Sequence, residues 1–135
     1  MREILFRGKD SESGIWCYGD LSFDREGKPY IRFWAHNGYL VRAVDPETVG
    51  QFTGFFDKWN TRVFEGDILR SIYPDEPYEP AICYERVIWD DGCWCSVHKE
   101  NAPDEIWQID LTRYSKVVGN IFDNGGLLEV MDDEN

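Results

Sequence analysis

The sequence predicts a mostly β protein in which residues from about 50 to 122 form a small barrel. Six Trp, seven Tyr and eight Phe occur among 135 residues, and aromatic side chains favour the pleated surface of a sheet over a helix. Turn signals recur about every 8–12 residues, the spacing typical of an all-β barrel or sandwich. At ~25 cal/mol per Å² buried, a few such rings supply most of the apolar stabilisation of a core.

Four strand patterns occupy the N-terminal part of the chain, and the alternation of apolar and polar residues is clearest in the third of them. Between the third and fourth patterns, Asn37-Gly38 predicts a hairpin, because a type I′ turn needs positive φ at both central residues. The strands are expected over residues 3–7, 15–23, 30–36 and 39–44, followed by a turn or single helical turn at 45–48. One face of the second strand is predicted to carry Ile15, Cys17, Leu21 and Phe23, and the other face Trp16, Tyr18, Asp20 and Ser22.

The second half of the chain continues the pattern with further strands and turns. Gly66 is expected to be a bulge or sharp bend within residues 62–71, and Asp91-Gly92 predicts another type I′ hairpin. Residues 73–80 contain three prolines and are expected to form an exposed loop. Residues 104–114 fit either a strand or a helix, and the strand is favoured. The remaining strands are expected over residues 50–56, 82–89, 93–98 and 116–122.

Glu65-Gly66-Asp67-Ile68-Leu69, then a long loop, then the hairpin at Asp91-Gly92 is the order of elements in SH3-like barrels. We therefore expect an SH3-like barrel, with the N-terminal strands packed on it or extending its sheet. The length of the chain suits one domain, expected over residues 1–128. The acidic residues 129–135 are expected to be a disordered tail.

Six segments carry a family resemblance: residues 1–7 (MREILFR), 49–54 (VGQFTG), Asp57-Lys58, 64–69 (FEGDIL), 89–94 (WDDGCW) and 118–124 (VGNIFDN). In this order and spacing they resemble the YopX proteins of phages and prophages. The resemblance covers residue 1 to about residue 128. It implies a small, mostly β phage protein without an assigned activity, so no catalytic or ligand-binding residue can be carried across.

Charge and cysteine usage narrow the function classes. Twenty-six acidic against fourteen basic residues give a net charge of −12, which opposes a phosphate backbone and disfavours direct nucleic-acid binding. The acidity is interpreted as a solubility feature. The N-terminus lacks the apolar segment of a signal peptide, so we expect a cytoplasmic protein of a bacterial host with reduced thiols. The free cysteines are expected to be Cys17, Cys83, Cys93 and Cys95.

Two groups of residues are candidates for chemical sites. Cys93 and Cys95 lie two apart on a predicted strand, so they share a face, but His98 falls on the opposite face and zinc prefers four ligands. We favour the interpretation that Cys93 and Cys95 are two small residues packed in the core. The carboxylates are interpreted as solvated turn residues; they are Glu65, Asp67, Asp90 and Asp91. The sequence predicts no enzyme, no cofactor and no metal.

An excess of aromatic residues remains once a core is filled, and it predicts an interaction surface, because Trp and Tyr are enriched at protein interfaces. We expect a non-enzymatic accessory protein that acts through protein contacts with itself as a homo-oligomer or with a host or phage protein. The alternative is a nucleic-acid-linked role, either weak single-strand binding through exposed aromatics or an acidic surface that imitates DNA. The candidate surface residues are Trp16, Tyr18, Trp34, Trp59 and Trp94.

Overall fold

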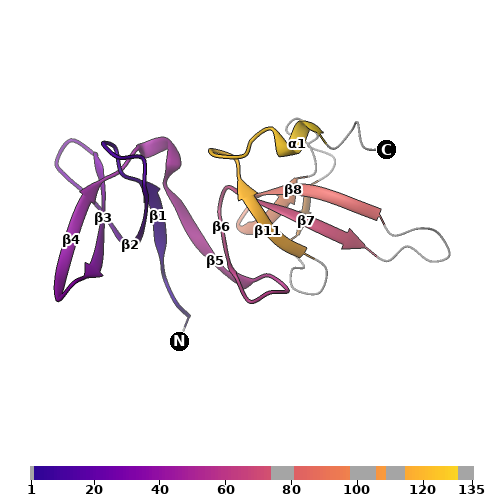
Figure 1. Ribbon diagram of the computed structural model, residues 1–135, viewed down its shortest axis with the longest axis horizontal. Coiled ribbons are helices and arrows are strands. Elements are labelled where there is room, and N and C mark those ends of the chain that lie inside the picture. Colours follow the sequence, from indigo (N-terminus) through magenta and orange to yellow (C-terminus); the bar gives the residue numbers. More distant parts are fainter. Residues whose placement is uncertain (1, 74–80, 98–105, 109–114, 131–135) are drawn as a thin grey trace. The chain divides into compact units, whose positions relative to one another are not determined.

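The computed structural model describes residues 2–73, 81–97, 106–108 and 115–130 (Figure 1). Within these residues the chain is mostly β, as predicted, with one short 3₁₀ turn and one short α-helix. It divides into two compact units, residues Met1–Gly54 (unit 1) and Phe55–Asn135 (unit 2). The single domain over residues 1–128 stays a prediction. No helix among the described residues is long and apolar enough to cross a membrane.

Unit 1 is built on an antiparallel sheet. Its strands are β1 (Phe6–Lys9), β2 (Trp16–Phe23), β3 (Pro29–Ala35), β4 (Gly38–Ala43) and the start of β5 (Gly50–Phe56). They lie in the order β4-β3-β2-β1-β5, and the 3₁₀ turn η1 (Pro46–Thr48) precedes β5. The first strand begins later than the predicted range of 3–7.

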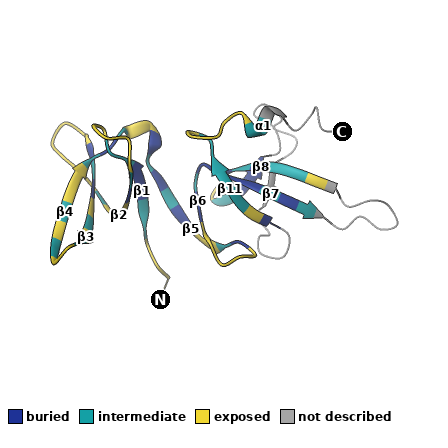
Figure 2. Cartoon of the chain, viewed as in Figure 1, coloured by how far each residue is buried: buried dark blue, intermediate teal, exposed yellow. Residues whose placement is uncertain are grey.

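The core of unit 1 is small and apolar. Cys17, Ile31 and Val44 are buried together, and Figure 2 shows buried positions on β1 and at the start of β5. Of the apolar residues expected on one face of the second strand, Cys17 belongs to this core, whereas Ile15 is 68% and Phe23 62% exposed. Ile15 precedes β2 and Phe23 is its last residue.

The hairpin of β3 and β4 turns one residue earlier than predicted. Ala35 pairs with Gly38, and positive φ values occur at His36 (51°) and Asn37 (75°). The two-residue loop is therefore His36-Asn37, which has the φ signs of a type I′ turn. Asn tolerates this left-handed region better than most residues, and Gly38 serves as the first residue of the strand.

Strand β2 changes partner halfway along its length. Its residues from Trp16 to Gly19 pair with β1, and those from Asp20 to Phe23 pair with β3. At the switch, Gly19 lies so close to the main chain of Arg32 that a Cβ placed there would be 2.9 Å from the Arg32 carbonyl carbon and closer still to its oxygen. Glycine is required here because the two backbones approach so closely.

Unit 2 contains a second antiparallel sheet. After β6 (Arg62–Phe64), it comprises β7 (Asp67–Tyr73), β8 (Ala81–Asp90), β9 (Cys93–Val97), β10 (Ile106–Gln108) and β11 (Ser115–Asn120), in the order β10-β9-β8-β7-β11. Because β10 and β11 end this order, the sheet of the described residues is open, and the predicted closed barrel is wrong. Turn chemistry fixes each hairpin, but closure depends on non-local pairing of the outer strands. The SH3-like assignment stays a prediction.

The turns of unit 2 agree with the local signals. Gly66 has a φ of +88° between β6 and β7, and the β8–β9 loop has positive φ at Asp91 (48°) and Gly92 (79°). In the ambiguous range 104–114, β10 is a strand, as favoured, and the other residues lie outside the described residues. The loop prediction for 73–80 and the tail prediction for 129–135 also fall mostly outside them. Helix α1 (Leu127–Val130) ends the described chain.

Asp57 ties the turn before β6 to the far end of the unit. Its Oδ1 accepts hydrogen bonds from the backbone N–H groups of Trp59 (2.9 Å) and Thr61 (2.8 Å), and its Oδ2 accepts one from Val117 on β11 (2.9 Å). The carboxylate is 4% exposed. Three main-chain donors are thus satisfied by one buried side chain, and Val117 also packs against the core of Val63, Leu69 and Val87.

Candidate functional site

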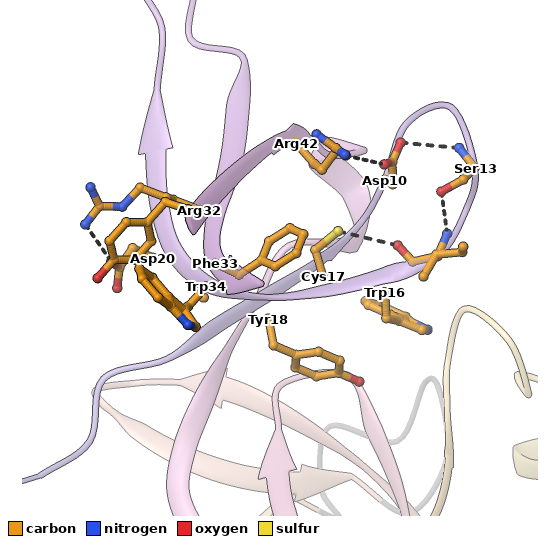
Figure 3. A pocket seen from close by; sticks show the side chains of 13 residues that line it. Asp10, Ser13, Trp16, Cys17, Tyr18, Asp20, Arg32, Phe33, Trp34 and Arg42 are labelled. Atoms are coloured by element: carbon orange, nitrogen blue, oxygen red, sulfur yellow. Dashed lines mark hydrogen bonds and ion pairs between the residues drawn. The ribbon is translucent and has the colours of Figure 1, made fainter. Parts of the chain in front are cut away.

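An open hollow of about 740 Å³ lies in unit 1, beside the point where β2 changes partner (Figure 3). The N-terminal half of β2 follows β1 there, whereas β3 and β4 continue as a hairpin beyond the last β2–β3 pair, Asp20 with Arg32. The hollow is lined by aromatic and charged side chains from these strands and from the 10–15 loop. They include Asp10, Trp16, Tyr18, Asp20, Arg32, Phe33, Trp34, Tyr39 and Arg42.

An exposed aromatic pair stands on the β3–β4 hairpin. Trp34 and Tyr39 are directly opposite in the register and meet edge to face, with ring centroids 5.0 Å apart at an angle of 81°. They remain 63% and 59% exposed. Such a contact is worth about 0.5–1.5 kcal/mol beyond area burial, so the rings hold each other in place while keeping most of their surface accessible.

A guanidinium group completes this cluster. Arg32 Cζ lies 4.4 Å from the Tyr39 ring centroid, and Arg32 Nη2 is 3.4 Å from Asp20 Oδ2. Both charged side chains are largely exposed, so the ion pair itself contributes only about 0–1 kcal/mol. Its effect is to orient the planar cation over the ring. We call Asp20, Arg32, Trp34 and Tyr39 the hairpin cluster.

The N-terminal half of β2 carries a second aromatic group. In Figure 3, Trp16 and Tyr18 lie on one side of β2 and Cys17 on the other. Arg7 Cζ is 4.6 Å and Lys9 Nζ 5.5 Å from the Trp16 ring centroid. Cations placed over the ring face in this way are attracted by its quadrupole. The rings of unit 1 are thus accompanied by positive charge, which the net charge of −12 conceals.

The 10–15 loop closes one end of the hollow. Asp10 Oδ1 accepts hydrogen bonds from the N–H groups of Glu12 (2.8 Å) and Ser13 (3.3 Å), and these bonds hold the pKa of Asp10 below its usual value. Arg42 Nε lies 3.7 Å from the Asp10 carboxylate. Behind them, burial raises the pKa of the Cys17 thiol, so this sulfur remains protonated at neutral pH.

Three predicted surface residues therefore come together, namely Trp16, Tyr18 and Trp34. The other two belong to unit 2. Trp59 is 66% exposed, with the Nζ atoms of Lys58 and Lys116 each 5.9 Å from its ring centroid. Trp94 packs against the core of unit 2 and meets Trp89 edge to face at 4.9 Å.

The other members of the hairpin cluster were missed by sequence reasoning. Asp20, Arg32 and Tyr39 look like ordinary strand residues in the sequence. The signal that finds them is the strand register, which sets Asp20 opposite Arg32 and Trp34 opposite Tyr39.

The two cysteines of β9 do share a side, as predicted. Cys93 Sγ and Cys95 Sγ are 3.4 Å apart, and burial, followed by the hydrogen bond with Cys93, raises the pKa of Cys95 to about 11. Within the described part of the chain, no three His, Cys, Asp or Glu side chains converge as a metal site. His98 lies outside the described residues.

The four candidate carboxylates of the sequence do not form a pair at one cleft; they are Glu65, Asp67, Asp90 and Asp91. Asp67 is buried and its Oδ2 accepts the Phe64 N–H at 2.7 Å, so it stabilises the bend around Gly66. Glu65 beside it is half-buried, and Asp90 and Asp91 are exposed at the β8–β9 turn. The interpretation as solvated turn residues fits Asp90 and Asp91, and it is wrong for Asp67, which is 2% exposed because its carboxylate accepts a buried main-chain N–H group.

Comparison with known proteins gives a family and a fold. The family model described as "YopX protein" matches residues 5–129. No curated protein matches the chain. Among solved structures, the crystal structure of protein EF1440 from Enterococcus faecalis is similar, with a TM-score of 0.55 and 20% identity over 95% of this chain and 99% of that chain. At this identity the likeness shows the fold alone.

Proposed function

The chain belongs to the YopX family, and from that premise we propose that it is a non-enzymatic phage or prophage accessory protein of the bacterial cytoplasm that works through protein contacts. The first partner is a second copy of the chain, so the protein is a homo-oligomer. The observation that carries the proposal is the hairpin cluster, with Trp34 and Tyr39 63% and 59% exposed.

The chemistry of the cluster suits a protein interface. Trp, Tyr and Arg are the residues that most often dominate binding energy when a partner buries them. Here Arg32 already lies over Tyr39, and the rings already contact each other. Little side-chain entropy is lost on binding, because the exposed groups are ordered before the partner arrives.

The position of the cluster favours association through a sheet edge. Strand β4 ends the sheet order of unit 1, and it carries Tyr39 and Val41, the latter 49% exposed. The C-terminal end of β4 is already bridged to the segment before β2, since Ala43 O accepts the Ser11 N–H and Val44 pairs with Asp10. The edge around Tyr39 and Val41 is the part that can pair with the same edge of another copy. A two-fold arrangement of two β4 strands places both hairpin clusters beside the new interface and closes the assembly as a dimer.

Sedimentation velocity over a range of protein concentrations tests this proposal. The wild-type protein should sediment as a dimer at micromolar concentration. The double variant Trp34→Ala with Tyr39→Ala, and the single variant Val41→Lys, should each weaken association by at least about tenfold, since hot-spot truncation costs roughly 2 kcal/mol or more.

Trp59→Ala is the matched control, because it removes an equally exposed ring from unit 2. It should leave the dimer unchanged. A wild-type protein that remains monomeric at the highest concentration, or a dimer that survives both β4-side variants, contradicts the proposal.

A second candidate function is weak binding of single-stranded nucleic acid. The observation that favours it is the placement of Arg7, Lys9 and Arg32 over exposed or half-buried rings, since base stacking on aromatics together with cationic groups is the mode of strand-binding proteins. Fluorescence anisotropy with a labelled oligothymidylate at low salt tests it. Arg32→Glu should abolish binding in that case, and an absence of binding by the wild type rejects the candidate.

A further inference from the structure

The tip of the β8–β9 hairpin gathers three soft or neutral donor atoms that the interaction surface does not use. Cys93 is half-buried and Cys95 is 4% exposed. Their Sγ atoms lie 3.4 Å apart. The main-chain oxygen of Asp90 lies 3.4 Å from Cys93 Sγ and 3.9 Å from Cys95 Sγ. The three atoms therefore form a nearly equilateral triangle.

The size of this triangle matches a metal ion. With sides of 3.4, 3.4 and 3.9 Å, all three corners are about 2.1 Å from a common centre. Zinc–sulfur bonds are about 2.3 Å long, so an ion at that distance from each donor sits only about 1 Å above the triangle's plane. No shift of the backbone is required to bring the donors into range.

The same geometry opposes a disulfide between the two sulfurs. The Cβ atoms of residues two apart on a strand point to the same face and lie about 6.6 Å from each other, whereas a disulfide needs its two Cβ atoms roughly 3.5–4.5 Å apart. One bridging atom between the sulfurs relaxes that requirement. The pair is thus arranged for chelation and not for oxidation to a ring.

We propose that Cys93, Cys95 and the Asp90 carbonyl form a binding site for one thiophilic divalent cation of the zinc class. Thiolate donors select such ions over magnesium or calcium. On binding, each thiol gives its proton to solvent and its sulfur electron pair forms a bond to the ion, so two protons leave for every cation bound.

The electrostatics of the turn support a cation. Asp90 and Asp91 both act on the Cys95 thiol with negative charge. The turn also fixes the third donor, since positive φ at Asp91 and Gly92 allows the two-residue loop that sets Asp90 opposite Cys93. Because the third donor is a main-chain carbonyl, the site contains no third cysteine or histidine that a sequence motif would reveal.

Titration of the reduced, metal-free full chain with Cd²⁺ tests the proposal, because a thiolate–cadmium bond produces a near-ultraviolet charge-transfer absorption. We expect one Cd²⁺ per chain with a Kd of roughly 1 μM or below. Cys93→Ser should lower the affinity at least about tenfold and leave no more than about half of the absorption. Cys95→Ser should act in the same way.

Cys83→Ser is the control, since it removes a half-buried thiol of β8 on the same sheet; it should leave binding unchanged. Asp90→Asn keeps the carbonyl and should change affinity by less than about fivefold. Because Cys95→Ser alters a buried position and can disturb folding, a second readout uses the wild type. Bound Cd²⁺ should protect Cys93 and Cys95 from iodoacetamide, as located by mass spectrometry, while Cys83 gains no protection.

The proposal would be overturned if Cd²⁺ saturates the wild type without producing thiolate absorption, or if Cys93→Ser leaves binding intact. It would also be overturned if bound Cd²⁺ protects Cys83 and not the β9 pair. A Kd weaker than roughly 100 μM would overturn it as well. The outcome is independent of self-association, because neither cysteine belongs to the hairpin cluster.

Discussion

Replacing Asp57 by alanine provides the sharpest test of how unit 2 is held together. The substitution leaves three backbone N–H groups without their acceptor, those of Trp59, Thr61 and Val117. The two turn donors lie among exposed residues, where water replaces much of the lost bond, at about 1 kcal/mol each, as for a lost cap. The Val117 donor on β11 loses a bond to a charged group, worth about 2 kcal/mol. We expect a total loss of about 4 kcal/mol.

Asp57→Asn separates the two parts of this effect. Its amide oxygen still accepts the turn donors, but its NH₂ group faces the Val117 N–H and cannot accept from it. We expect about 2 kcal/mol, half the effect of alanine. The two values together measure what the turn and the β11 link each contribute.

Urea unfolding followed by tryptophan fluorescence measures both variants, as shifts in the transition midpoint at unchanged slope. Asp24→Ala is the control, because Asp24 also accepts two turn N–H groups, from Glu26 and Lys28, but is exposed; its effect should be smaller. A loss below about 1 kcal/mol for Asp57→Ala would refute the argument that one buried carboxylate joins the turn to β11.

Three further predictions concern particular contacts. In the same urea assay, Gly19→Ala should destabilise unit 1 by about 3 kcal/mol, because the added Cβ meets the Arg32 main chain. Gly38→Ala is the control: a Cβ added there contacts nothing within 4 Å, so stability should change by under about 0.5 kcal/mol. Ser71→Ala and Ser115→Ala should each cost about 1–2 kcal/mol, because each leaves the other buried hydroxyl of the 2.7 Å pair unsatisfied, and a double-mutant cycle should show the combined loss well below the sum. Hydrogen bonds from Lys28 N–H and Glu26 N–H hold the pKa of Asp24 below its usual 3.8. The ionised carboxylate therefore stabilises the folded state above about pH 3.8, and this contribution is lost as the pH falls through the lower pKa of the folded state. NMR titration of the carboxyl group should show the lowered pKa, with Asp24→Asn as the control.

Local signals predicted the strands and most turns because they depend on a few adjacent residues. Gly66, Asp91 and Gly92 adopt the positive φ values expected of them. The closed barrel was wrong because pairing of the outer strands involves residues far apart in the sequence, and their local patterns say nothing about it.

The hairpin cluster shows how a small error in a turn hides a site. A turn at Asn37-Gly38 would set Trp34 opposite Val41, whereas the observed loop sets Trp34 opposite Tyr39. A shift of one residue in the loop moves every cross-strand partner by two. The aromatic residues were therefore identified, but their pairing and the role of Arg32 followed only from the register.

The change of partner along β2 has a consequence for how this fold can vary among relatives. Between the Asp20–Arg32 pair and the hairpin tip, β3 and β4 pair only with each other among the residues that the structure describes. Inserting or deleting one residue in each of its two strands therefore changes the reach of the tip by about 3.4 Å, while the pairs that hold Ile31 in the core stay in place. Two residues per strand preserve which face the aromatic side chains occupy. Sequence changes among relatives can thus alter the length of this arm in discrete steps.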